Sequence, residues 1–181
     1  MSRTFGPIVQ NGYVVDDLDA AVTHWIERLG VGPFFLLPPL RFERCAFRGV
    51  ATDPVLHIAV ANSGGLQIEL IEQVNAAPSA HREFLETHGP GLQHVSVWSE
   101  DYDDDLARHT AAGHRVLQDA TIPGGVRLTY FDTGLHGGAV MEMLELHDRG
   151  RAMMAEIRDA AIGWDGRDPR RTLSATTRPT T

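Results

Sequence analysis

Hydrophobic residues along the chain follow two spacings, one typical of helices and one typical of strands. Between Leu18 and Leu29 they recur every three or four residues and form one apolar stripe, which predicts an amphipathic helix. Gly30 follows and ends this helix, because glycine readily adopts the left-handed conformation of a helix C-terminus. Similar patterns predict three further helices: Ser79 to His88, Leu106 to Ala112 before Gly113, and Asp148 to Ala161.

Alternating or continuous apolar stretches predict the strands. The first begins at Ile8, and an equivalent one begins at Leu92. Gly124–Gly125 and Gly137–Gly138 predict hairpin turns. The remaining predicted strands are Pro33 to Leu37, Arg41 to Arg48, Val55 to Ala61, Leu66 to Gln73, Arg115 to Ala120, Arg127 to Asp132 and Ala139 to Leu146.

The order of these elements is nearly the same in two halves of the chain. A module over residues 8–73 and a second over 91–147 both read β-α-β-β-β, with a linker at 74–90. The final strands agree closely, Leu66–Glu72 against Ala139–Glu145. We therefore expect an α+β fold, with both modules in one domain at residues 5–147.

Two segments follow the repeat. A C-terminal helical segment is expected at residues 148–163. Residues 164–181 are polar and rich in Arg, Pro and Thr, so this tail is expected to be disordered.

Four polar residues hold equivalent places in the repeat. Gln10 and His94 each lie two residues after the start of the first strand of their module. They are on the face opposite the apolar side chains that a helix would cover. Glu69 and Glu142 lie among aliphatic neighbours in the last strand of each module. A carboxylate in such a place is costly unless it is paired or binds a cation.

If the open faces of the two modules meet, these four side chains can converge. An imidazole, two carboxylates and an amide oxygen suit one divalent ion of intermediate hardness, and Zn, Ni, Co, Fe(II) and Mn all qualify. The two carboxylates would neutralise its charge and leave a Lewis acid for oxygen ligands of a substrate.

Composition and charge narrow the classes of partner. The chain has 181 residues, 43% of them hydrophobic and 22% charged, and a net charge of -8. This charge repels phosphate, so binding to nucleic acid or to an anionic membrane is not expected. Lysine is absent, which excludes Schiff-base and P-loop chemistry, and the single Cys45 excludes an intrachain disulfide. The start of the chain is too short and polar for a signal peptide and no apolar run is long enough to span a membrane, so a cytoplasmic protein is expected.

The chain resembles the vicinal oxygen chelate superfamily, which includes glyoxalase I, methylmalonyl-CoA epimerase, extradiol dioxygenases and antibiotic-resistance binding proteins. The resemblance covers Ile8 to about Leu146 and rests on the opening strand from Gln10, on Glu69 within Ile68–Glu72, on His94, and on Glu142 within Gly138–Glu142. It implies paired βαβββ modules that form a cupped mixed sheet around a metal, with a C-terminal helix added here.

The four implied metal ligands, Gln10, Glu69, His94 and Glu142, are similar to those of one branch of glyoxalase I. Extradiol dioxygenases of this superfamily have a second histidine where this chain has Glu69, which argues against oxygen chemistry. The epimerase has a glutamate acid/base where this chain has His57, and an imidazole can also transfer protons near neutral pH.

The sequence therefore predicts a metal-dependent lyase or isomerase (epimerase) that acts on a small hydroxy- or keto-substrate through a metal-stabilised enolate. Glu142 is expected to take the α-proton, and His57 or Glu69 to return it. The alternative is a non-catalytic binding protein of the antibiotic-resistance kind, which holds an apolar ligand in the same cup. An Fe(II)-dependent extradiol-type dioxygenase is a third, disfavoured alternative.

Three further residues are candidates for the substrate pocket. Trp98 shares the face of His94, and Gln67 shares the face of Glu69. Phe42 belongs to the apolar run that starts at Phe34, which fits core packing, a homodimer interface or an apolar substrate wall. The histidines outside His57 and His94 are expected to be solvated, namely His24, His81, His88, His109, His114, His136 and His147.

Overall fold

The computed structural model describes residues 2–134, 140–174 and 177. These residues form one mixed sheet of twelve strands with four helices. The helices are α1 (Leu18–Leu29), α2 (Ala80–His88), α3 (Tyr102–Ala111) and α4 (Asp148–Ala161). The strands are β1 (Gln10–Val14), β2 (Phe34–Leu36), β3 (Leu40–Arg41), β4 (Arg44–Phe47), β5 (Val50–Ala51), β6 (Val55–Ser63), β7 (Leu66–Gln73), β8 (Gly91–Ser99), β9 (Arg115–Ile122), β10 (Val126–Asp132), β11 (Val140–Glu145) and β12 (Arg170–Arg171).

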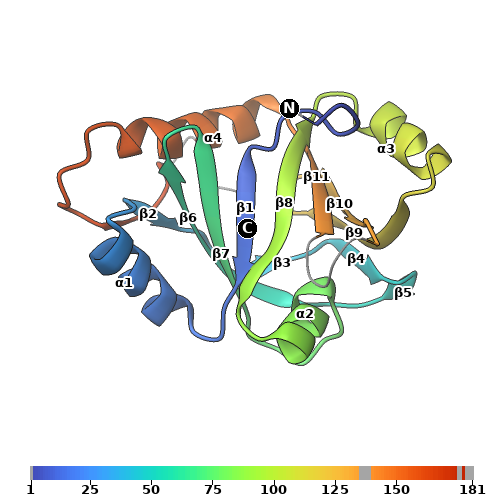
Figure 1. Ribbon diagram of the computed structural model, residues 1–181, viewed down its shortest axis with the longest axis horizontal. Coiled ribbons are helices and arrows are strands. Elements are labelled where there is room, and N and C mark those ends of the chain that lie inside the picture. Colours follow the sequence, from blue (N-terminus) through green and yellow to red (C-terminus); the bar gives the residue numbers. More distant parts are fainter. Residues whose placement is uncertain (1, 135–139, 175–176, 178–181) are drawn as a thin grey trace.

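The two modules meet along their first strands. The strand order is β12-β2-β6-β7-β1-β8-β11-β10-β9-β4-β5, with β3 attached to β6. The strands β1 and β8 run antiparallel at the centre, and each lies parallel to the last strand of its own module, β7 or β11 (Figure 1). This arrangement confirms the predicted α+β fold of two βαβββ modules in a cupped mixed sheet.

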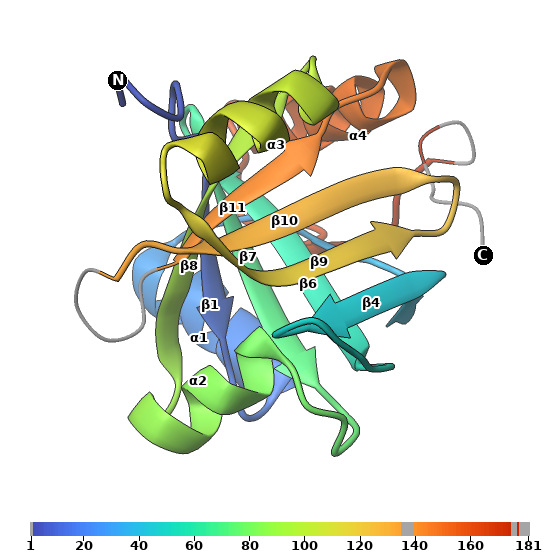
Figure 2. The same ribbon diagram turned by 90° about the vertical axis from the view of Figure 1, so that its right-hand side faces the viewer.

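One segment of the first module crosses to the far edge of the second. The sheet order places β2 near one end and β4 near the other, although only residues 37–43 lie between them in the chain. Figure 2 shows β4 alongside β9, with which it pairs antiparallel. The strand predicted at 41–48 is therefore two short strands, because the chain leaves β6 after Arg41 and joins β9 from Arg44.

Helix ends follow the signals in the sequence. The side chain of Asp17 accepts a hydrogen bond from the backbone of α1, and Gly30 ends that helix in the left-handed conformation. Ser79 caps α2 in the same way. Helix α3 begins at Tyr102, and its first turn holds the acidic run Asp103–Asp105, which the positive end of the helix dipole favours.

Helices cover both faces of the sheet. Helices α1 and α3 pack on the outer face of their modules, against the side chains that alternate away from the cup. Helix α4 packs instead on the inner face of the first module, where Ile157 contacts Leu56, Ile58 and Ile71. The inside of the cup is thus partly filled by the C-terminal helix.

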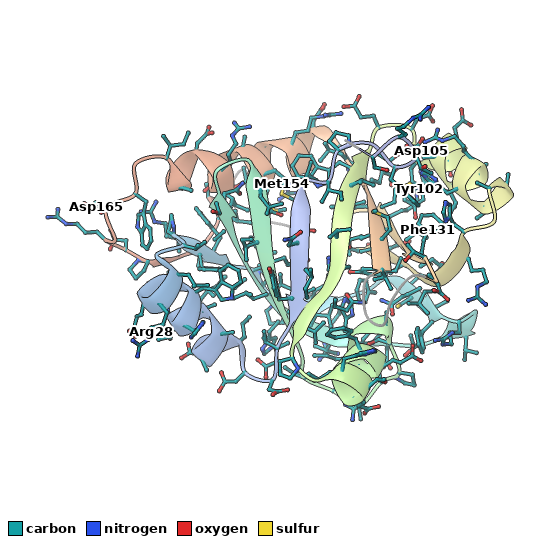
Figure 3. All side chains as sticks on the ribbon, in the orientation of Figure 1. Arg28, Tyr102, Asp105, Phe131, Met154 and Asp165 are labelled. Carbon is teal, nitrogen blue, oxygen red and sulfur yellow. The ribbon has the colours of Figure 1, made fainter. Side chains whose placement is uncertain are left out.

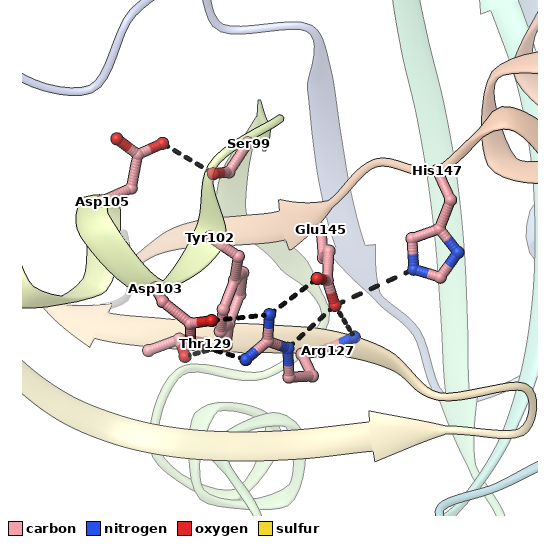
Figure 4. Close-up of polar contacts among 8 residues, drawn as sticks. All are labelled: Ser99, Tyr102, Asp103, Asp105, Arg127, Thr129, Glu145 and His147. Atoms are coloured by element: carbon pink, nitrogen blue, oxygen red, sulfur yellow. Dashed lines mark hydrogen bonds and ion pairs between the residues drawn. The ribbon is translucent and has the colours of Figure 1, made fainter.

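A charged network joins α3 to the second module on its outer side. The guanidinium of Arg127 donates to both carboxylate oxygens of Glu145 and to Asp103, and it lies over the ring of Tyr102 at 4.4 Å (Figure 4). Glu145 thereby has a lowered pKa, because Arg127 stabilises its charged form. The network connects β10, β11 and α3.

The segment after α4 includes a short strand that joins the sheet. The strand β12 pairs parallel with β2, and Leu173 is buried among core residues of the first module. The expectation of a disordered tail is therefore wrong for residues 164–174, because the apolar Leu173 and the backbone of β12 both find partners. The predicted Gly137–Gly138 turn, the strand start at Ala139, and residues 175–176 and 178–181 lie outside the described residues.

No helix within residues 2–134, 140–174 and 177 combines the length and the apolar character needed to cross a membrane.

Candidate metal centre and adjoining cavity

The strand register repeats the same geometry in each module. On the parallel pair β1–β7, Gln10 lies opposite Gln67, two residues before Glu69. On the parallel pair β8–β11, His94 lies opposite Val140, two residues before Glu142. Because side chains of a strand alternate with a period of two, Gln10 shares one face of the sheet with Glu69, and His94 shares one with Glu142.

The central pair of strands adds the second half of this symmetry. Gln10 lies opposite Ser96, and His94 lies opposite Gly12. A Cβ atom at position 12 would come within 1.9 Å of His94 Cε1, so the imidazole occupies space that only glycine leaves open. Gly12 therefore lets the histidine of one module reach across the strand of the other.

This register brings three of the four predicted ligands into contact. The Nε2 atom of His94 lies 3.4 Å from a carboxylate oxygen of Glu69 and 3.7 Å from one of Glu142. The side chain of His94 is fully buried, and its Nδ1 atom lies 2.7 Å from the buried side-chain oxygen of Gln93. Because an amide oxygen only accepts, Gln93 holds a proton on Nδ1, so in the neutral form of the ring the lone pair lies on Nε2, the atom nearest the carboxylates.

Gln10, the fourth predicted ligand, is oriented by a neighbour. Its amide nitrogen donates to the side-chain oxygen of Gln67 at 2.7 Å, and Gln67 in turn donates to the sulfur of Met154 on α4. The remaining oxygen of Gln10 is buried and has no hydrogen-bond partner. Two other buried atoms share this condition at the site, His94 Nε2 and Ser96 Oγ.

Burial and mutual charge shift the pKa values of these groups. Burial raises the pKa of Glu69, and the charge of nearby Glu142 raises it further. Burial opposes the charged form of His94, but the two carboxylates beside it favour that form and raise its pKa overall. The negative charge of the carboxylates and the positive charge of the imidazolium thus stabilise one another at a site that is buried from solvent.

The donor set suits a divalent cation, although its atoms are not already gathered around one point. No group of three or more His, Cys, Asp or Glu side chains among the described residues is arranged to hold a metal ion. The chemistry of the donor atoms does fit such an ion. The ring nitrogen of His94 and the amide oxygen of Gln10 are buried without a hydrogen-bond partner, and two carboxylates lie beside the nitrogen. Gln10, Glu69, His94 and Glu142 are the residues that could hold the ion.

The sequence of the chain matches a family whose members share this paired-module architecture. The sequence model of the glyoxalase/bleomycin resistance protein/dioxygenase superfamily matches residues 9–131. The chain belongs to this superfamily. The match starts just before Gln10 and runs through β10, so it contains both central strands and three of the four predicted ligands.

Solved structures of the superfamily fold resemble this chain at low sequence identity. Methylmalonyl-CoA epimerase from Mycobacterium tuberculosis is 22% identical with a TM-score of 0.56, and the match covers 84% of this chain and 96% of the epimerase. A second methylmalonyl-CoA epimerase structure is 20% identical (TM-score 0.51; 82% and 100% covered). A hypothetical protein from Bacillus halodurans is 14% identical (TM-score 0.55; 78% and 95% covered). No match was found among curated proteins.

In this superfamily member the candidate centre opens into a cavity of about 280 Å³. Gln10, Glu69 and Glu142 line it, together with the hydroxyl-bearing Tyr130. Most of the other lining residues are hydrocarbon side chains of β6, α4 and the crossing segment 37–43, namely Leu37, Pro38, Pro39, Leu40, Phe42, Leu56, Ile58, Val60, Met153 and Met154. Of the three interpretations of the apolar run from Phe34, core packing applies to Phe34 and Phe35, whereas Phe42 lines the cavity.

Trp98 lies in a different cavity from the one expected. It lines a second, more polar hollow of about 530 Å³ with Asn62, Glu100 and Arg151. Gln67 and Met154 line both cavities, so their hydrogen-bonded pair forms the wall between them. Of the predicted pocket residues, Gln67 and Phe42 thus line the cavity with Glu69 and Glu142, and Trp98 does not.

His57 faces away from this cavity. On β6, Leu56 and Ile58 line the cavity, while Ala59 packs under α1 on the opposite face. Alternation along the strand puts His57 on the same face as Ala59. This placement is contrary to the proton-transfer role expected for His57, because a one-residue offset in a strand reverses the face.

Two residues that the sequence analysis did not select lie next to Glu142. Tyr130 on β10 contacts the His94 ring edge-on and lies opposite Glu142 on the neighbouring strand β11. Burial and then the two carboxylates raise the pKa of Tyr130 well above its ordinary value, so it remains a donor. Behind it, His81 on α2 lies 3.2 Å from the same hydroxyl.

His81 and His109 are both buried, so the expectation that they are solvated is wrong. Each belongs to a helix face that packs against a strand of the second module, His81 against Tyr130 and His109 against Phe131. A single histidine on a helix gives no sequence signal that separates a buried ring from a solvated one. The signal for Tyr130 is its alternation with Leu128, which places both on the cup face of β10.

Proposed function

We propose that this protein is a metal-dependent isomerase or lyase that transfers a proton at a carbon next to a carbonyl group. The observation that carries the proposal is a cluster of buried donor atoms: the Gln10 oxygen and His94 Nε2 have no hydrogen-bond partner, and Nε2 has only the carboxylates of Glu69 and Glu142 beside it. Buried polar atoms without partners are rare in folded proteins unless a ligand completes them. Zn, Ni, Co, Mn and Fe(II) all suit the donor set.

Bound between these residues, a divalent ion would supply a Lewis acid for the carbonyl oxygen of the substrate. The chain itself supplies two carboxylates near Nε2 of His94, one from each module. In the proposal, Glu142 accepts the proton from the substrate carbon, and Glu69 returns a proton. The hydrocarbon walls exclude water, which strengthens the effect of each charged group on the substrate.

The ligand assignment is tested by metal content. Tag-free protein is incubated separately with Zn, Ni, Co, Mn and Fe(II), dialysed, and analysed by plasma mass spectrometry beside the His94→Ala and Glu142→Ala variants. We expect about one ion per chain in the wild type and strongly reduced binding in both variants. Equal metal content in all three proteins would place the ion elsewhere, and its absence from all three would remove the Lewis acid from the proposal.

The reaction type is tested by proton exchange. Small enolisable ketones are incubated with the metal-loaded protein in D2O, and loss of the α-proton signal is followed by NMR. We expect exchange with the wild type and at most a residual rate with Glu142→Gln, which keeps the shape of the side chain but cannot accept the proton. Substantial exchange by this variant would contradict the role of Glu142, with circular dichroism as the check on its folding.

A second candidate function is a non-catalytic binding protein. The hydrocarbon lining of the cavity favours it, because such walls hold an apolar ligand without any chemistry. Tight binding of apolar ligands by a protein that takes up no metal and exchanges no protons would support this alternative. The homodimer expected from the apolar run stays a prediction, which sedimentation velocity would check.

A further inference from the structure

We propose that the cavity selects an anionic carbonyl compound whose carbonyl and anionic groups lie at opposite ends of a hydrocarbon body. The carbonyl would lie at the buried end beside Glu69 and Glu142, the hydrocarbon along the apolar walls, and the anion on Arg41. This inference rests on the proposed function for the placement of the carbonyl, and it adds the class of substrate.

The two ends of the cavity differ in burial. Glu142 and Gln10 are buried at one end, at 5% and 3% exposure. Pro39 and Arg41, which line the same cavity, are exposed to solvent. The cavity therefore has a closed end with carboxylates and a rim that carries a guanidinium.

Arg41 is suited to bind a ligand because of what surrounds it. Among the described residues, Arg41 is the only basic side chain that lines this cavity. No carboxylate of the described residues lies within ion-pair distance of its guanidinium. Its neighbour Arg44, by contrast, is paired with Asp119. A guanidinium with free donors binds carboxylate or phosphate oxygens through two parallel hydrogen bonds.

Charge also fixes the direction of the ligand. In the metal-free cavity an anionic group at the closed end would meet Glu69 and Glu142 in a poorly hydrated space, which is unfavourable. At the rim the same group meets the guanidinium of Arg41. The anion is therefore expected at the rim, and the uncharged carbonyl at the closed end.

The middle of the cavity sets the nature of the ligand body. Leu37, Leu40 and Phe42 of the crossing segment line it together with Leu128 and Leu144 of the second module. These walls offer no hydrogen bonds to a polyhydroxylated body and favour an aromatic or branched aliphatic one. A volume of about 280 Å³ admits a body the size of a single ring.

Three small ketones separate these contributions. The probe 4-acetylbenzoate has the carbonyl, the ring and the carboxylate in the proposed order. In 4-methylacetophenone a methyl group replaces the carboxylate, and levulinate keeps the ketone and the carboxylate but lacks the ring. Binding of each is measured by calorimetry to metal-free and to Co-loaded protein, for the wild type, Arg41→Gln and Arg28→Gln.

Arg28 is the matched control, because it projects from α1 on the outer side of the molecule (Figure 3). It lies away from the cavity, whose position is marked in the same view by the lining residue Met154 beside the strands. We expect 4-acetylbenzoate to bind the wild type at least about tenfold more tightly than either of the other ketones. In Arg41→Gln the preference over 4-methylacetophenone should fall to about twofold or less, and in Arg28→Gln it should be unchanged.

Equal binding of 4-acetylbenzoate and 4-methylacetophenone, or a preference that survives in Arg41→Gln, would overturn the inference. So would levulinate binding as tightly as 4-acetylbenzoate. Failure of the proposed function would give a different result. The protein would take up no Co, while the metal-free protein would still show the Arg41-dependent preference for 4-acetylbenzoate.

Discussion

The imidazole ring of His94 lies against the backbone of Gly12 on the neighbouring central strand, in the space that a Cβ atom would fill. This contact joins the two halves of the repeat, because Gly12 belongs to the first module and His94 to the second. It also sets how far the His94 ring extends toward Glu69 and Glu142.

Gly12→Ala tests this contact. The added methyl group would lie 1.9 Å from His94 Cε1, so the ring must move, and we expect a loss of stability of about 1–3 kcal/mol. Metal affinity should fall at least about tenfold, measured by competition with a chromophoric chelator. Gly65→Ala is the control, since a Cβ there meets open space; similar losses in both variants would contradict a specific role for Gly12.

Tyr130→Phe tests whether the hydroxyl beside Glu142 positions that carboxylate. The change removes the hydroxyl that partners the buried His81 ring and should lower the free energy of unfolding by about 1–3 kcal/mol. Metal affinity should fall as well if the Tyr130 hydroxyl, which lies across the strand pair from Glu142, orients that carboxylate. Tyr102→Phe removes a similarly buried hydroxyl on the outer side, bonded to Thr129. It should affect stability alone, and a matching drop in its metal affinity would count against positioning by Tyr130.

His81 should make the protein less stable in acid. Burial lowers its pKa to about 3, against an ordinary value of 6.5, so between these two pH values the unfolded chain binds more protons than the folded one. The stabilisation is therefore full above about pH 6.5 and is lost, by at most about 1.4 kcal/mol per pH unit, as the pH falls toward 3.

Urea titrations at a series of pH values would measure this slope. His81→Gln should flatten it over that range, whereas His24→Gln, at an exposed position of α1, should leave it unchanged. An unaltered slope in His81→Gln would assign the acid sensitivity to other groups, such as His109, whose pKa burial also lowers.

Arg127→Met tests the network on the outer side of the second module. Arg127 of β10 donates to Glu145 of β11 and to Asp103 of α3, so these two elements lose a common partner. We expect a loss of stability of about 1 kcal/mol that shrinks in high salt. Arg115→Met, which removes a single exposed pair with Asp132, should cost less than half as much. Chemical denaturation at low and high NaCl compares the two, and equal losses would show that the network adds nothing beyond one surface pair.

The sequence by itself determined the local structure and the symmetry of this protein. Ser79, Asp17 and Gly30 mark helix ends through their own hydrogen bonds or backbone freedom, so no distant residue was needed to place them. The repeat placed Gln10, Glu69, His94 and Glu142 in equivalent positions, because strand alternation is a local property that both copies share.

The tertiary structure decided what those residues meet. It turned His57 away from the cavity, buried His81 behind Tyr130, and carried Phe42 and Arg41 to the cavity on a segment that crosses between opposite edges of the sheet. Such contacts depend on which strands pair across long separations and on where α4 packs, and an identical local pattern is compatible with several of these pairings. The assembled sheet therefore decides which side chains share the cavity. The sequence repeat alone identifies the four equivalent polar residues, Gln10, Glu69, His94 and Glu142.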